Sequence, residues 1–273
     1  MSRGLHSRRE IQRTLGVVSV VLATAVLGAC HLDISNRAEA RDQWQRHYTL
    51  AQGGTFEIRN TNGLIHIEPG TGDAIDVSAD RIVRGPDDAA AKEGLAQLEI
   101  QETASPTGVT LDSTNRNAGL NLINLSRRVD YHVKVPEWAN IKLNSTNGEI
   151  EITGPRLTGT FRATSTNGQI SATGLENSAS VETTNGSVTL RVSKLGEDGI
   201  SCETTNGRIA LTVPSAVKAR LSARVSNGGI KTDGLDVAVS EQSRRRLDGT
   251  IGGGGPLIRL QTTNGAVEIR GSK

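Results

Sequence analysis

The sequence predicts an all-β protein, a single-stranded parallel β-solenoid (a right-handed β-helix) with one short inserted helix. Two observations carry this prediction. A motif ending in Asn-Gly recurs along the chain, in its fullest form as "ETTNG" at residues 182–186 and again at 203–207. On both sides of the motif, aliphatic residues alternate with polar ones, which is typical of strands that bury one face.

The repeats return at nearly constant spacing. From Asn147 to Asn227 the steps between successive motif asparagines are 20, 18, 21 and 21 residues. A period near twenty is typical of a solenoid, in which each coil covers the apolar side of its neighbour. Treating the longer gaps as multiples of this period predicts about ten coils. The motif asparagines are Asn62, Asn147, Asn167, Asn185, Asn206, Asn227 and Asn264.

One coil illustrates the pattern, "NIKLNSTNGEIEITG" at residues 140–154. Ile141 and Leu143 alternate with polar residues before the motif, and Ile150 and Ile152 alternate with polar residues after it. Asn-Gly between two such runs also suits a β-hairpin. A hairpin does not explain a twenty-residue repeat, so we interpret the motif as a corner between two sheets of the solenoid.

The motif could form a row of binding sites or a repeated architectural corner, and its chemistry favours the corner. Asparagine tolerates left-handed backbone angles, and glycine accepts positive φ without a Cβ penalty. Asparagines stacked from coil to coil can also hydrogen-bond one another, each bond adding about 1 kcal/mol. A parallel row of hydroxyls is expected beside this ladder, from Thr146, Thr166, Thr184, Thr205, Ser226 and Thr263.

Two segments interrupt the repeats. Residues 85–100, "GPDDAAAKEGLAQLEI", predict an inserted helix of about three turns with acidic residues at its start. Residues 240–256 contain a glycine run that lacks the Gly-Lys-Ser/Thr ending of a phosphate-binding loop. We expect this second segment to be a mobile excursion and not a nucleotide site.

The N-terminal segment predicts export and lipid attachment. Residues 1–29 combine basic residues with an apolar run, from Leu15 to Ala29, that is short for a membrane span. The run leads into "LGAC", which looks like a lipobox whose Cys30 thiolate accepts diacylglycerol. An uncleaved anchor helix, a plain signal peptide and twin-arginine export are the alternatives. Residues 30–50 are expected to form a tether and residues 51–273 the solenoid domain.

Charge and cysteine content restrict the possible partners. Residues 1–29 hold four arginines and one glutamate, so their removal moves the formal net charge from +2 to −1. With no strong charge and few aromatic residues, no nucleic-acid partner is expected. Lipid on Cys30 would leave Cys202 without a disulfide partner, and its place in the alternating run "GISCETT" predicts a buried thiol.

The segment "VDYHVKVPEWANIKLNSTNGEIEITG", residues 129–154, and the ending "GGGGPLIRLQTTNGAVEIRG" resemble the bacterial putative-adhesin family of unknown function. The resemblance covers most of residues 51–270. It implies a β-solenoid that is often attached to lipid or membrane in the cell envelope. It implies no catalytic residues.

An enzyme is an alternative class, because β-solenoids also host polysaccharide lyases and hydrolases. Glu182 and Glu203 occupy equivalent places in successive coils, about 5 Å apart, which suits a retaining carboxylate pair. No general-acid companion or row of aromatic residues accompanies them, so we interpret them as a solvated face. His66 and His132 are expected on strands without ligand partners, and no metal or other cofactor is predicted.

The sequence therefore predicts a non-catalytic, lipid-anchored protein of the cell envelope that acts as a binding, adhesion or scaffold module. The expected partners are the membrane, through the lipid, and an envelope protein or glycan. His31 follows the modified cysteine where an aspartate would signal retention, which favours the outer membrane in a host that has one. The alternatives are a polysaccharide-acting enzyme and an accessory sensor in envelope stress signalling.

Overall fold

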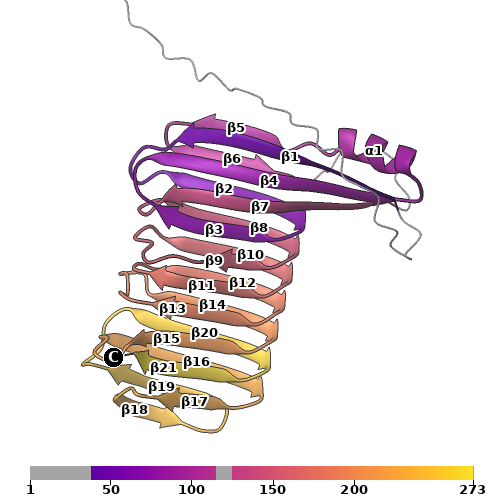
Figure 1. The fold of residues 1–273 in the computed structure, drawn as a ribbon. Coiled ribbons are helices and arrows are strands. Elements are labelled where there is room, and N and C mark those ends of the chain that lie inside the picture. The colour runs from indigo at the N-terminus through magenta and orange to yellow at the C-terminus, as the bar shows by residue number, and fades with distance from the viewer. Residues whose placement is uncertain (1–37, 115–124, 273) are drawn as a thin grey trace, which may run out of the picture.

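Strands dominate the computed structural model, which describes residues 38–114 and 125–272 (Figure 1). They form two sheets that face each other along the stack, sheet A with ten strands and sheet B with eleven. The helix α1 (Asp88–Ala96) is the one helix among the described residues. The predicted all-β solenoid with a short inserted helix is confirmed. The predicted signal segment and Cys30 lie outside the described residues.

The order of strands in each sheet is as follows. Sheet A runs β1 (Ala38–Thr49), β4 (Ala74–Gly85), β7 (Ser126–Pro136), β3 (Ile65–Gly70), β9 (Ile150–Ile152), β11 (Ile170–Leu175), β13 (Val188–Val192), β15 (Ile209–Pro214), β21 (Val267–Ser272) and β17 (Ile230–Asp233). Sheet B runs β18 (Val237–Gln242), β19 (Arg246–Ile251), β16 (Ala219–Asn227), β20 (Leu257–Asn264), β14 (Ile200–Asn206), β12 (Ala179–Asn185), β10 (Phe161–Asn167), β8 (Asn140–Asn147), β2 (Thr55–Asn62), β6 (Gly108–Asp112) and β5 (Gln101–Ser105).

A coil consists of one strand of sheet B, an Asn-Gly corner and one strand of sheet A. The described residues contain seven such coils, and the prediction of about ten is wrong. The long gaps in the repeat hold other strands and α1 in place of further Asn-Gly coils. In order along the stack, the coils are β2–β3, β8–β9, β10–β11, β12–β13, β14–β15, β20–β21 and β16–β17.

The core is a narrow layer of aliphatic side chains between the sheets. Neighbouring coils pair in parallel and in register, so Ile150 lies beside Ile170, and Ile170 beside Val188. All three side chains are fully buried. Burial of one such side chain contributes about 1.5–3 kcal/mol, and the column repeats in every coil. Alternation of aliphatic and polar residues therefore suffices to define both faces of each sheet.

The coils are not stacked in chain order. The last coil of the chain, β20–β21, lies between β14–β15 and β16–β17. At the other end, β2–β3 lies between β6–β7 and β8–β9. The first and last Asn-Gly coils in chain order, β2–β3 and β20–β21, therefore each have a paired strand on both sides in both sheets.

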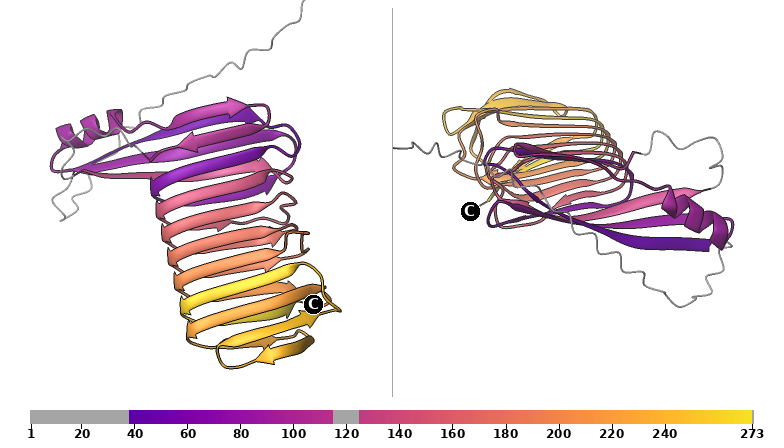
Figure 2. Two further views of the ribbon diagram at one scale, coloured as in Figure 1. Left: turned by 180° about the vertical axis from the view of Figure 1, so that it is seen from behind. Right: turned by 90° about the horizontal axis from the view of Figure 1, so that it is seen from above.

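An antiparallel ribbon of β1, β4 and β7 extends beyond the stack at its N-terminal end, with α1 packed against β1 and β4 (Figure 2). We call these four elements the wing. The prediction of a tether over residues 30–50 is wrong for residues 38–49, which form β1. Trp44 and Tyr48 lie on the same face of this strand and pack against the core. The other residues of the strand are mostly polar, so the two-residue period of burial does not appear as an alternation of apolar and polar residues in the sequence.

The inserted helix begins at the predicted place. Asp87 caps it, because its carboxylate accepts a hydrogen bond from the Ala90 amide at 2.8 Å. Ala91 and Gly94 are buried, and a Cβ on Gly94 would lie 2.8 Å from a methyl of Val83. Small residues therefore bring α1 into close contact with β4.

The prediction of a mobile excursion over residues 240–256 is also wrong. Most of this segment belongs to β18 and β19, an antiparallel pair that covers the edge of β16. Leu247 and Ile251 point into the core from β19. Three successive glycines, Gly252, Gly253 and Gly254, have φ of 59°, 86° and 92°, and they turn the chain back toward β20.

Candidate functional site

The structure brings all seven motif asparagines together in one row along the corner of the stack. Each side-chain amide donates to the Oδ1 of the neighbouring asparagine, at 2.8–2.9 Å. Every bond runs in the same direction, toward the N-terminal end, where the Asn62 amide donates to the Arg127 carbonyl at 3.0 Å. The row along the stack is Asn62, Asn147, Asn167, Asn185, Asn206, Asn264 and Asn227.

The glycine of the motif is required by close stacking more than by positive φ. A Cβ on Gly168 would lie 1.9 Å from the Gly148 carbonyl oxygen, and one on Gly207 equally close to that of Gly186. No side chain fits at that distance. The corner therefore selects glycine because each coil rests directly on the backbone of the next.

A second ladder lies just inside the asparagines and was missed by the sequence argument. The buried Thr183, Thr204 and Thr262 donate to the carbonyls of the glycines in the adjacent coil at 3.3, 3.0 and 2.9 Å. The signal was present, because each of these threonines lies two residues before a motif asparagine. With side-chain and backbone groups bonded to one another, the inner corners have little left to offer a ligand.

The two carboxylates considered for catalysis lie side by side on an open face. Glu182 and Glu203 are register partners on β12 and β14, and both are exposed. Their row continues with Thr164 on one side and Gln261 on the other. Neither of the two hollows described below is lined by Glu182 or Glu203.

The histidines on sheet A are engaged by neighbours. His66 lies within hydrogen-bonding distance of Glu151 at 3.1 Å and of Glu68 at 3.2 Å. The His132 ring lies beside it, with ring centroids 5.9 Å apart. Among residues 38–114 and 125–272, no three His, Cys, Asp or Glu side chains are arranged to hold a metal ion.

Cys202 is buried in the core, as predicted. Burial raises the pKa of its thiol to about 12, so the reactive thiolate is scarce near neutral pH. Within the described part of the chain, no helix is both long and apolar enough to cross a bilayer.

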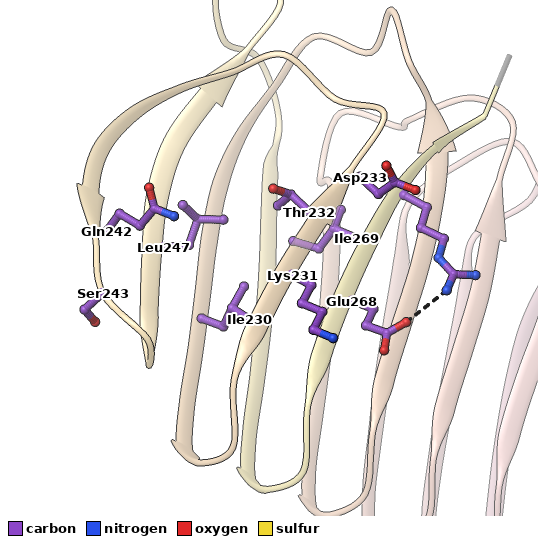
Figure 3. A pocket seen from close by; sticks show the side chains of 10 residues that line it. Ile230, Lys231, Thr232, Asp233, Gln242, Ser243, Leu247, Glu268 and Ile269 are labelled. Carbon is purple, nitrogen blue, oxygen red and sulfur yellow. Dashed lines mark hydrogen bonds and ion pairs between the residues drawn. The ribbon is translucent and has the colours of Figure 1, made fainter.

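The C-terminal end of the stack contains a hollow of about 570 Å³ (Figure 3). Gln242 and Leu247 contribute to it from sheet B, and Ile230 and Thr232 from β17. Charged residues of sheet A complete it, including Glu268, which pairs with Arg270 at 3.2 Å. A smaller hollow of about 210 Å³ lies at the opposite end, between the wing and the first corner.

The larger hollow exists because the two sheets end at different levels. Sheet B continues past its last Asn-Gly coil with β19 and β18, whereas sheet A ends at β17. Val239 on β18 is a register partner of Gly249, on the face of the hairpin that buries Leu247 and Ile251. Within residues 38–114 and 125–272 no strand of sheet A lies opposite it, and Val239 is 47% exposed. It is the one large hydrophobic side chain so exposed among the described residues.

A family model described as Toastrack DUF4097 matches residues 50–270. The match spans most of the chain, so the protein belongs to this family. The resemblance to the putative-adhesin family of unknown function is thereby confirmed at the level of the family. No curated protein matches the sequence.

Three solved structures are similar in outline. One is a putative cell adhesion protein from Clostridium sporogenes, at 12% identity and a TM-score of 0.47, covering 84% of this chain and all of that one. A putative adhesin from Bacteroides fragilis has 14% identity and a TM-score of 0.30, with 84% and 97% covered. A putative lipid binding protein from Parabacteroides distasonis has 8% identity and a TM-score of 0.26, with 83% and 96% covered. At this level of similarity, function has to be argued from the geometry of this chain.

Proposed function

We propose that this protein is a non-catalytic binding module of the bacterial cell envelope, anchored by lipid on Cys30, that holds a protein partner at its C-terminal end. The observation that carries the proposal is the hollow beside the last strand of sheet A, because concave sites of this kind are where proteins bind ligands.

The position of the hollow suits an anchored protein. β1 begins eight residues after Cys30, at one edge of sheet A, and β17 forms the opposite edge. Ten strands at their usual spacing place the two edges about 40 Å apart. A lipid on Cys30 would hold the wing near the membrane and present the hollow away from it. His31 after that cysteine favours the outer membrane, in a host that has one.

The chemistry of the hollow favours a polypeptide over a sugar. Its lining is aliphatic and charged and includes no aromatic ring on which a sugar could stack. Two carboxylates line it, Asp233 and Glu268. Glu268 is engaged by Arg208 and Arg270, and Asp233 is the register partner of Arg270, so neither has the apolar surroundings that a general acid requires. Glu182 and Glu203 lie elsewhere, on the flat face of sheet B, which supports a binding role without catalysis.

The test is crosslinking of the full-length protein in its native cells, followed by identification of the attached molecules. We expect a specific protein, recovered with the membrane fraction. Recovery of wall glycan alone would contradict the proposal. A Cys30→Ser variant is expected to leave the membrane fraction while its fold is unchanged, and continued membrane association would refute the lipid anchor.

A further inference from the structure

The outer edge of β17 has free hydrogen-bonding groups. The Val267 amide of β21 donates to the Gly229 carbonyl at 3.0 Å, so the backbone groups of Gly229 face β21. Because these groups alternate between the two sides of a strand, the N–H and C=O of Lys231 also face β21, and those of Ile230 and Thr232 face away from it. β17 is the last strand of sheet A among the described residues, so these outward N–H and C=O groups have no strand beside them.

The corner at this end is also incomplete. In the inner coils, the corner glycine donates its N–H to the next asparagine carbonyl, as Gly168 does to Asn185 at 3.0 Å. Each inner asparagine also receives an amide hydrogen on its Oδ1. Within the described residues, nothing accepts from the Gly228 N–H or donates to the Asn227 Oδ1. One further Asn-Gly corner would satisfy both groups.

The opposite wall of the hollow has room for inward side chains. Val239 and Leu247 lie on the inner face of β18 and β19, at the level where sheet A has no strand. A strand added beside β17 would place every second side chain against this wall. Aliphatic residues at those positions would bury Val239 and extend the core by one coil.

Charge on the outer face indicates what should alternate with those aliphatic residues. Lys231 is the register partner of Glu268, and Asp233 is the partner of Arg270. Opposite charges directly across a strand pair are favourable, and like charges are not. A strand on the free side of β17 would therefore match best with an acidic residue beside Lys231 and a basic residue beside Asp233.

We infer that the free edge of β17 binds an extended segment of the partner polypeptide, which adds to sheet A as a parallel strand. The matching segment carries Asn-Gly, then alternates aliphatic, acidic, aliphatic and basic residues. This inference rests on the proposed function, since it names the chemistry of the partner at the same end of the molecule. Strand addition combines backbone hydrogen bonds with pockets for alternate side chains.

The probe is a peptide with the sequence of residues 262–271, TTNGAVEIRG, which has this pattern and already forms the inner neighbour of β17. It is titrated into the full-length protein in detergent, and backbone amide signals are followed by NMR. We expect saturable shifts at Ile230 and Thr232. A peptide with the two charges exchanged, TTNGAVRIEG, is the control and is expected to bind about tenfold more weakly, since 1.4 kcal/mol corresponds to tenfold.

A matched pair of protein variants tests the mode of binding. Thr232→Pro removes an outward N–H without touching the pairing with β21, and proline is tolerated at an edge. It is expected to weaken peptide binding about tenfold or more, whereas Thr232→Ala keeps the N–H and should bind like the parent. Unchanged melting temperatures in both variants would show that the fold is intact.

Four results would overturn the inference. Equal binding of both peptides would exclude recognition of the charge pattern, and equal binding by both variants would exclude the strand edge. Self-association of the protein that Thr232→Pro abolishes would mean that a second copy occupies the edge. If no peptide binds while a cellular partner still crosslinks at this end, strand addition is wrong and the proposed function stands.

Discussion

The two ends of the solenoid are finished differently. At the N-terminal end, β7, β4 and β1 extend sheet A beyond the first coil, and β6 and β5 extend sheet B. At the C-terminal end, only sheet B is extended, by β19 and β18. The last rung of the ladder reflects the same difference, because Asn62 donates to the Arg127 carbonyl, whereas the Asn227 Oδ1 has no donor among the described residues.

We interpret this difference as one end built for stability and the other for binding. A solenoid needs covered ends, since an open sheet edge can pair with other chains. At the N-terminal end, both sheets continue past the first Asn-Gly coil. At the C-terminal end, sheet B continues by two strands and sheet A by none, so a strand-sized position beside β17 is left opposite β19 and β18. An end that only needed protection would have both sheets covered.

The largest effect is expected from a side chain at an inner corner. A Cβ at Gly148 would lie 1.9 Å from the Gly63 carbonyl oxygen, so Gly148→Ala must displace neighbouring coils. We expect a loss of about 3 kcal/mol or more in the free energy of unfolding. Gly229→Ala at the open end is the control, because a Cβ there meets nothing within 4 Å. Equal melting temperatures for the two variants would contradict the close stacking.

The next effect distinguishes an inner rung from the last one. Asn185 donates to Asn167 and accepts from Asn206, whereas Asn227 only donates, to Asn264. Asn185→Ala is expected to cost about 2 kcal/mol and Asn227→Ala about 1 kcal/mol, measured by denaturant unfolding. If Asn185→Ala melts like the parent, the ladder does not stabilise the fold.

A pH effect is expected at the covered end. Burial raises the pKa of Glu57, but hydrogen bonds from Arg59 and Lys142 outweigh it and leave the pKa below its ordinary value of 4.5. The carboxylate therefore stabilises the fold above pH 4.5, and this contribution disappears as the pH falls through the lowered pKa. Glu57→Gln should melt below the parent at neutral pH, with the gap closing in acid. A gap that is constant with pH would exclude this ion pairing.

The smallest effect is expected at Val239, on the inner face of β18. Val239→Ser removes an exposed side chain and should change the free energy of unfolding by no more than about 0.5 kcal/mol. Val213→Ser, at a fully buried position of β15, should cost several times more. A large loss in Val239→Ser would mean that this side chain belongs to the core and not to a binding surface.

Sequence reasoning succeeded where the physics is local to one coil. The alternation around Ile150 and Ile152 and the spacing of the Asn-Gly motif were enough to predict strands, corners and two buried faces. The order of the coils could not be predicted from the sequence. The edge of β14 can pair in parallel with any strand of the same aliphatic pattern, and it pairs with β20 and not with β16, the next such strand along the chain. The exposure of Val239 was equally invisible, since it follows from a strand that sheet A lacks and not from the residues around it.

Site-resolved crosslinking in the native cell tests most directly whether the C-terminal end holds the partner. A photoreactive side chain is placed at Lys231, on the open edge, or at Glu182, on the flat face of sheet B; both positions are exposed. We expect one specific protein adduct from position 231 and none from position 182. Adducts from position 182 alone, or the same adducts from both positions, would contradict the claim that the C-terminal end holds the partner.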